Sequence, residues 1–133
     1  MMKRLLLILL LILLLTGCSI STDKTTSIKS YENFSNLIIS DPSEQLTQDY
    51  SVYYLYYFQE TCSHCNFIKN EVLSKIELLE NDVVFLIDVH GVNDIAESIN
   101  VTHTPSIVKI VDHKVEYVKE GPNPVLEVIN SLS

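Results

Sequence analysis

Two residues, Ser63 and His64, separate Cys62 from Cys65. A thiolate, not a thiol, attacks a disulfide, so a cysteine that exchanges disulfides needs a low pKa. At a helix N-terminus, unsatisfied N–H groups and the positive end of the helix dipole favour such a thiolate. We therefore expect the pKa of Cys62 to lie below the free value of about 8.5. Cys65, one turn further in, should be more buried and able to resolve a mixed disulfide.

His64 can supply a cationic or hydrogen-bonding partner to the Cys62 thiolate, which makes it a candidate tuning residue. Two other uses of the motif stay open. A disulfide between Cys62 and Cys65 could be a structural link, although closing so short a loop restricts the unfolded chain little. The two cysteines and His64 could also form part of a zinc or copper site, but structural zinc normally has four ligands. We expect no metal and no organic cofactor, because the dithiol is itself the redox group.

The residues on either side of the motif predict a strand followed by a helix. Val52–Phe58 is an unbroken run of β-branched, aliphatic and aromatic residues, which is typical of a strand buried on both faces. After the cysteines, apolar residues recur every three or four positions along one helical face: Ile68, Val72, Ile76 and Leu79. The strand therefore leads directly into a helix that has the cysteine pair at its N-terminal end.

The remaining pattern predicts an α/β fold around these two elements. Residues 83–89 predict a strand parallel to the first, and residues 106–111 and 115–118 predict an antiparallel hairpin with a turn at 112–114. Three further helices are predicted, and the first has Tyr31, Phe34, Leu37 and Ile38 on one face. The second begins with Asp94 as N-cap and Glu97 three residues later, and it carries Ile95 and Ile99. The third begins with Asn123 as N-cap and Pro124 as its first residue, and it buries Val125, Leu126, Val128 and Ile129. The expected order is α-β-α-β-α-β-β-α, a central mixed sheet with flanking helices.

The N-terminus has the pattern of an export signal. Lys3 and Arg4 precede an apolar run over residues 5–15, whereas about 20 apolar residues are needed to cross a bilayer as a helix. Leu15-Thr16-Gly17-Cys18 resembles the bacterial lipobox, in which the cysteine is lipidated and becomes the first residue after cleavage. The alternative is an ordinary cleaved signal peptide. If Cys18 carries two or more acyl chains, the membrane anchor is stable.

We therefore divide the chain into a signal peptide at residues 1–17, a lipidated N-terminus and flexible tether at 18–30, and one domain at 31–133. Residues 1–17 hold two of the nine basic residues and none of the 17 acidic ones. The strongly acidic remainder argues against binding of nucleic acid and against a polybasic contact with anionic lipid. Lipidation would use the thiol of Cys18 and leave one cysteine pair, in a compartment where disulfides persist.

Over residues 31–133 the chain resembles the thioredoxin superfamily. The resemblance rests on the strand that runs into Cys62-Ser63-His64-Cys65, on Thr104-Pro105 about forty residues later, and on the terminal hairpin and helix. It implies a thioredoxin-like fold with a cis peptide bond at Pro105, where the Thr104 backbone pairs with a cysteine-containing peptide. The plain alternative is a trans bond at the start of an edge strand. His103 is expected near the same surface as a solvated loop residue.

The chain also departs from that family. Thioredoxins carry a buried acid six positions before the first cysteine and a Trp directly before it, where this chain has Tyr56 and Thr61. The proton-handling carboxylate is therefore not where the resemblance would put it, and Asp88 and Glu60 are the acids that we suspect instead. The Cys-x-His-Cys motif resembles that of Dsb-type oxidases and disulfide isomerases, but Ser63 replaces their usual Pro or Gly, which leaves the redox poise open.

The resemblance implies a thiol–disulfide oxidoreductase that is lipid-anchored at the extracytoplasmic face of a membrane. Its partners would be cysteine-containing exported proteins and a redox partner protein, and we expect a monomer. The expected site comprises Cys62 as nucleophile, Cys65 as resolving thiol, His64 as tuning group, and Ser63, Thr104 and Pro105 as substrate contacts. Two rival functions stay open: an accessory or binding lipoprotein of the same fold without redox turnover, and a metallochaperone. The direction of electron flow is left open by the sequence.

Overall fold

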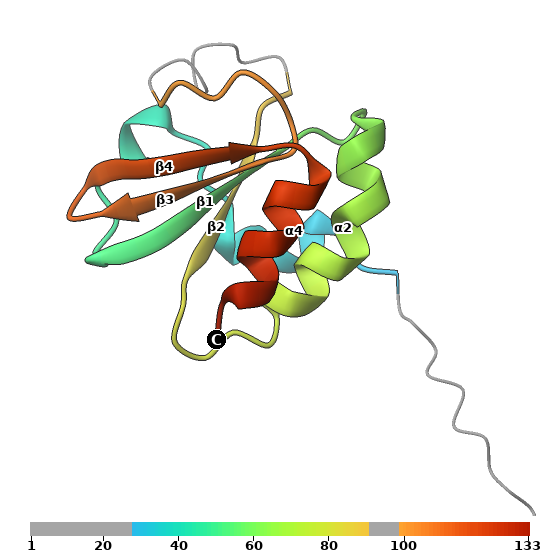
Figure 1. The fold of residues 1–133 in the computed structure, drawn as a ribbon, viewed down its shortest axis with the longest axis horizontal. Helices are drawn as coiled ribbons and strands as arrows, with labels where there is room; N and C mark the ends of the chain where they lie inside the picture. Colours follow the sequence, from blue (N-terminus) through green and yellow to red (C-terminus); the bar gives the residue numbers. More distant parts are fainter. Residues whose placement is uncertain (1–27, 91–98) are drawn as a thin grey trace, which may run out of the picture.

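One four-stranded mixed sheet forms the centre of the computed structural model, which describes residues 28–90 and 99–133. The strands lie in the order β2-β1-β3-β4 (Figure 1). Their bounds are Val52–Phe58 for β1, Val84–Asp88 for β2, Ser106–Val111 for β3 and Lys114–Glu120 for β4. β1 pairs with β2 in parallel, and the other two pairings are antiparallel. The expected α/β class with a central mixed sheet is confirmed.

β1 lies inside the sheet, as its continuous apolar sequence predicts. All its residues except Val52 are buried, because the strand has a neighbour on each edge and a layer on each face. Side chains of a strand alternate between the two faces. Tyr54, Tyr56 and Phe58 therefore belong to one hydrophobic cluster, and Tyr53, Leu55 and Tyr57 belong to the cluster on the opposite face.

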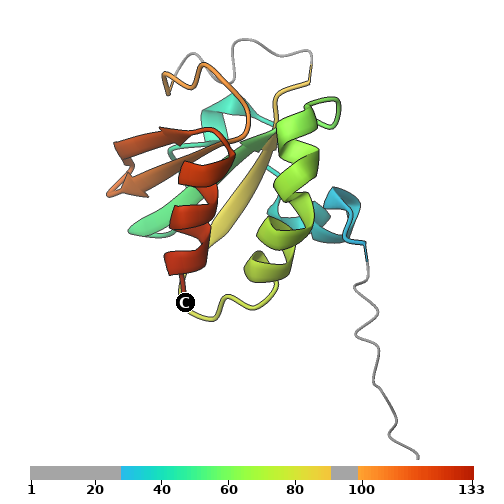
Figure 2. The same ribbon diagram turned by 45° about the vertical axis from the view of Figure 1, so that its right-hand side comes forward.

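Helices α2, Ser63–Ile76, and α4, Pro122–Ser131, cover the face that holds Tyr56. Figures 1 and 2 show them side by side on the same side of the sheet. The expected apolar stripe of α2 is confirmed, since it buries Ile68, Val72 and Ile76. The helix ends at Ile76, and Leu79 follows it as a partly buried residue of the same cluster.

The first element is a 3-10 helix, η1, at Tyr31–Leu37, and not the α-helix that the spacing suggests. Its backbone is non-helical at Phe34, and a segment this short is marginal without tertiary contacts. Burial of Tyr31 and Phe34 fixes it against the α2 side of the core. Ile38 leaves the helix to form a parallel bridge with Leu86 of β2. A second short 3-10 helix, η2, follows at Pro42–Glu44.

The start of α4 differs from the prediction, which had Asn123 as the N-cap. The cap is Gly121, whose φ of 94° lies in the region that favours glycine, and Pro122 begins the helix. The reason is a contact outside the helix, because Gly121 N donates to Pro105 O at 2.8 Å. Val125 and Ile129 are buried as expected, and Leu126 and Val128 pack against the same cluster.

The hairpin is confirmed and is longer than predicted, since β4 continues to Glu120. Asp112 and His113 form its turn, both with positive φ. The helix predicted from Asp94 lies largely outside the described residues, although Ile99 is buried. Within residues 28–90 and 99–133, no helix has the length and apolar character needed to cross a bilayer.

Candidate functional site

Cys62 and Cys65 form a disulfide at the N-terminal end of α2. Cys62 is the N-cap of the helix, and its Sγ accepts a hydrogen bond from Cys65 N at 3.1 Å. The Cα atoms of the pair are 5.2 Å apart. The sulfur of Cys62 thus faces the free N–H groups that begin α2, which is the environment that stabilises a thiolate after reduction.

The two sulfurs differ in access to solvent. Cys65 is completely buried in the cluster beneath the helix, whereas Cys62 is only partly buried. This difference agrees with the expectation that Cys65 is the more protected thiol. Ser63 and His64, between them, are exposed. In the part of the chain that the structure describes, the His64 side chain has no hydrogen bond or ion pair, so its tuning role remains a prediction.

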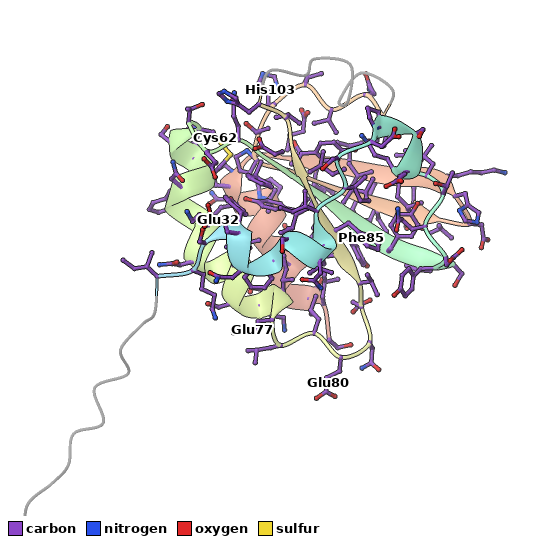
Figure 3. All side chains as sticks on the ribbon, turned by 180° about the vertical axis from the view of Figure 1, so that it is seen from behind. Glu32, Cys62, Glu77, Glu80, Phe85 and His103 are labelled. Atoms are coloured by element: carbon purple, nitrogen blue, oxygen red, sulfur yellow. A yellow bond between two sulfur atoms is a disulfide. The ribbon has the colours of Figure 1, made fainter. Side chains whose placement is uncertain are left out.

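The Thr104-Pro105 peptide bond is cis, as the resemblance implied. Thr104 O lies 3.4 Å from Cys62 Sγ, although the two residues are far apart in the sequence. The loop that carries Thr104 and the start of α2 lie at the same end of the molecule, and Figure 3 shows Cys62 and His103 there (Figures 1 and 3). The fold therefore brings the exposed sulfur against a backbone carbonyl that faces the same surface.

Glu120, the last residue of β4, contacts the loop that carries Thr104, and the sequence did not indicate this contact. Its carboxylate accepts hydrogen bonds from the backbone N atoms of Thr102 and His103, at 2.7 Å and 3.1 Å. The hairpin register places Glu120 opposite Ser106, next to the cis proline. The sequence would have indicated this contact only if the predicted second strand of the hairpin had continued past Val118.

Tyr56 lies beneath the site, at the position where the resemblance would place an acid. Its hydroxyl and that of Tyr31 are buried, and neither meets hydrogen-bond geometry with a partner in the described ranges. Burial raises the pKa of Tyr56, and nearby Tyr31 raises it further. Burial also raises the pKa of Tyr31 to about 12, an effect that Tyr56 opposes and that the charges of Asp88 and Glu60 reinforce. This position therefore holds a neutral phenol near neutral pH.

The two suspected acids, Asp88 and Glu60, are close enough to Tyr31 for their charges to raise its pKa. Asp88 ends β2 opposite Phe58, and its Oδ1 accepts a hydrogen bond from His90 N at 2.9 Å. Glu60 is exposed, and its backbone oxygen accepts a hydrogen bond from Asn66 Nδ2. A role for either acid in proton transfer remains a prediction. Among the described residues, no group of three or more His, Cys, Asp or Glu side chains could hold a metal ion.

The N-terminal sequence matches a family model. Residues 2–19 match the prokaryotic membrane lipoprotein lipid attachment site, which includes Cys18 and agrees with the lipobox. A match of this kind indicates a lipid-anchored membrane protein. None of the curated proteins matches the chain.

Solved thioredoxin structures match the fold. Mitochondrial thioredoxin 3 of Saccharomyces cerevisiae in its oxidised form is 20% identical, with a TM-score of 0.60, over 71% of this chain and 93% of that one. Plasmodium falciparum thioredoxin is 18% identical, with a TM-score of 0.62, over 72% and 98% of the two chains. Fasciola hepatica thioredoxin is 21% identical, with a TM-score of 0.57, over 73% and 96%. The chain thus combines a thioredoxin-like fold, a cysteine pair at the start of a helix and a lipoprotein attachment site.

Proposed function

We propose that this protein is a membrane-anchored thiol–disulfide oxidoreductase that exchanges disulfides with exported proteins. One observation carries the proposal: the partly exposed Cys62 sulfur lies 3.4 Å from Thr104 O, while its disulfide partner Cys65 is fully buried. An incoming thiolate can therefore reach Cys62 Sγ but not Cys65 Sγ. A peptide that carries this sulfur finds a backbone acceptor beside it.

The exchange proceeds in two balanced steps. When the protein oxidises a substrate, a substrate thiolate attacks Cys62 Sγ, the Cys62–Cys65 bond breaks, and Cys65 leaves as a thiolate that takes up a proton. A second substrate thiolate then attacks the substrate sulfur of the mixed disulfide and releases Cys62. The substrate gains a disulfide, and the protein retains two thiols. Reduction of a substrate is the reverse sequence, and a partner protein supplies or removes the two electrons.

Each site residue has a role in this scheme. Cys62 is the nucleophile, because it is the accessible sulfur and faces the N–H groups of α2. Cys65 resolves the mixed disulfide from beneath. His64 stabilises the Cys62 thiolate from its exposed position in the motif. Ser63, Thr104 and Pro105 contact the substrate, with the Thr104 backbone pairing with an extended peptide.

The anchor determines where this chemistry takes place. Residues 1–17 are the signal peptide, 18–30 the lipidated N-terminus and tether, and 31–133 the catalytic domain. Lipid on Cys18 would hold the domain at the extracytoplasmic face, where protein thiols become disulfides. Residues 18–30 would link the lipid to the domain, and two of them contact it: Lys29 N donates to Asn70 Oδ1 at 2.9 Å, and Ser30 is the N-cap of η1.

Insulin reduction and the oxidative refolding of a reduced protein test the proposal on the full-length protein in detergent. Wild type should catalyse at least one of these reactions, and Cys62→Ser should catalyse neither. If the variant equals wild type in both assays, the protein is an accessory lipoprotein whose cysteines do not turn over. Tight, stoichiometric binding of copper or zinc that requires Cys62, without either activity, would instead favour a metallochaperone.

A further inference from the structure

The carboxylate of Glu120 is surrounded by donors from a single loop. Oε1 accepts hydrogen bonds from Thr102 N at 2.7 Å and from His103 N at 3.1 Å. The Thr102 hydroxyl lies 3.0 Å from each of the two carboxylate oxygens. Burial alone raises the pKa of Glu120, but the hydrogen bonds from Thr102 and His103 outweigh it, so the pKa lies below its usual range. The carboxylate therefore remains ionised and bound to the loop near neutral pH.

The loop is also fixed at its other end. Ser106 Oγ donates to His103 O at 2.6 Å, and Gly121 N donates to Pro105 O at 2.8 Å. Between these fixed points lies Thr104, whose oxygen is the one beside Cys62 Sγ. Glu120 has no described contact with either sulfur. Any effect that it has on disulfide exchange must therefore act through the shape of residues 102–105.

The same contacts hold the His103 ring. Its Nδ1 lies 2.7 Å from Thr102 Oγ1 and 3.6 Å from Glu120 Oε2. The side chain is nevertheless 78% exposed and lies at the Cys62 end of the molecule (Figure 3). An exposed histidine would normally move freely, whereas this one is attached at one nitrogen. The loop thus presents a fixed backbone and a fixed side chain to an approaching polypeptide.

From these contacts we infer that Glu120 is a positioning residue, which holds residues 102–105 in the shape that receives an extended polypeptide and thereby favours protein disulfides over small ones. The inference rests on the proposed function. A small disulfide needs only the Cys62 sulfur. A polypeptide must also pair with the Thr104 backbone, and a loop that is already ordered lowers the entropic cost of that pairing.

The test compares how fast the protein reduces a polypeptide disulfide and a small disulfide. Full-length protein is mixed with insulin or with neutral hydroxyethyl disulfide in the presence of dithiothreitol, which reduces the Cys62–Cys65 disulfide after each turnover. With the uncatalysed rate subtracted, kcat/KM is measured for wild type, Glu120→Gln and Glu116→Gln. Glu116→Gln is the matched control, since Glu116 is on the same strand but pairs with Lys109 at 2.8 Å. Amide hydrogen exchange at Thr102 and His103 is followed in parallel, because it reports the order of the loop without any turnover.

Glu120→Gln should lower the ratio of kcat/KM for insulin to that for hydroxyethyl disulfide by about tenfold, mainly through KM, as expected for lost hydrogen bonds to a charged group. Exchange at Thr102 and His103 should accelerate, and Glu116→Gln should change neither quantity. An equal loss with both disulfides, or an unchanged ratio with unchanged exchange, would overturn the role of Glu120. The proposed function itself fails only if wild type neither reduces these disulfides nor catalyses oxidative refolding, so the two failures are distinguishable.

Discussion

Thr104 O lies 3.4 Å from Cys62 Sγ across a sequence separation of 42 residues. The contact joins the N-terminal end of α2 to the loop that precedes β3, which are the two ends of the proposed substrate site. It depends on the central position of β1, because the strand that leads to Cys62 pairs directly with β3. The fold thus brings together the Cys62 sulfur and the Thr104 backbone, which lie far apart in the sequence.

Membrane attachment should depend on Cys18 alone. Replacing it with alanine removes the thiol that receives lipid, and Cys18→Ala should move the protein from the membrane fraction to the soluble fraction. Fractionation of the producing bacterium, with incorporation of labelled palmitate, measures the effect. Cys62→Ser is the control and should remain with the membrane. Retention of unlabelled Cys18→Ala in the membrane would refute the lipid anchor.

Two buried tyrosines of β1 should respond differently to loss of their hydroxyls. Tyr57 donates to Gln45 Oε1 at 2.6 Å, so Tyr57→Phe should lower the free energy of unfolding by about 1–3 kcal/mol. The Tyr56 hydroxyl lacks a partner in hydrogen-bond geometry among the described residues, so Tyr56→Phe should change stability by less than about 0.5 kcal/mol or increase it. Urea unfolding measures both. An equally large loss in Tyr56→Phe would show that its hydroxyl is bonded in solution.

Alkaline pH should destabilise the fold through the same buried phenols. Burial raises the pKa of Tyr31 from 10.0 to about 12 and also raises the pKa values of Tyr56 and Tyr57. These groups ionise more readily in the unfolded chain, so their contribution is complete below pH 10 and is lost as the pH rises through the folded-state values.

Between about pH 10 and the folded-state pKa values, each of these buried tyrosines should lower the free energy of unfolding by about 1.4 kcal/mol per pH unit. Urea unfolding between about pH 10 and about pH 12 measures the slope, and Tyr31→Phe should make it shallower. A stability that stays constant over this interval would mean that the phenols are already accessible to solvent.

His64 should make the disulfide more oxidising. His64→Ala removes the proposed cationic or hydrogen-bonding partner of the Cys62 thiolate, so the reduced form should lose stability and the reduction potential should fall by on the order of 30 mV. Equilibration with glutathione measures the potential. The midpoint pH of Cys62 alkylation should also rise, because the thiolate forms less readily without His64. His113→Ala, in the β3–β4 turn, is the control. Identical potentials in wild type and His64→Ala would remove His64 from the site.

The sequence predicted an element correctly where a single local pattern determines that element. The uninterrupted run Val52–Phe58 predicted β1 with its bounds, and the apolar stripe after Cys65 predicted α2. Elements decided by distant contacts were predicted less well. Residues 31–37 form a 3-10 helix because the core holds Tyr31 and Phe34, and α4 begins early because Gly121 bonds to Pro105.

The site shows the same division. The cysteine pair and Thr104-Pro105 are visible in the sequence because their residue types carry the chemistry. Glu120 is an ordinary surface acid until the hairpin register places it opposite Ser106. No local pattern could have identified it, since its partners Thr102 and His103 belong to the loop before β3.

Trapping of a mixed disulfide tests the central claim most directly. Full-length Cys65→Ser retains the accessible sulfur and lacks the resolving one, so in cells it should form covalent complexes with exported proteins that disappear on reduction. Cys62→Ser, which retains only the buried sulfur, should form none. Non-reducing electrophoresis and mass spectrometry would identify the bonded cysteine as Cys62. Complexes formed equally by both variants, or by neither, would contradict an exchange that begins at the exposed sulfur.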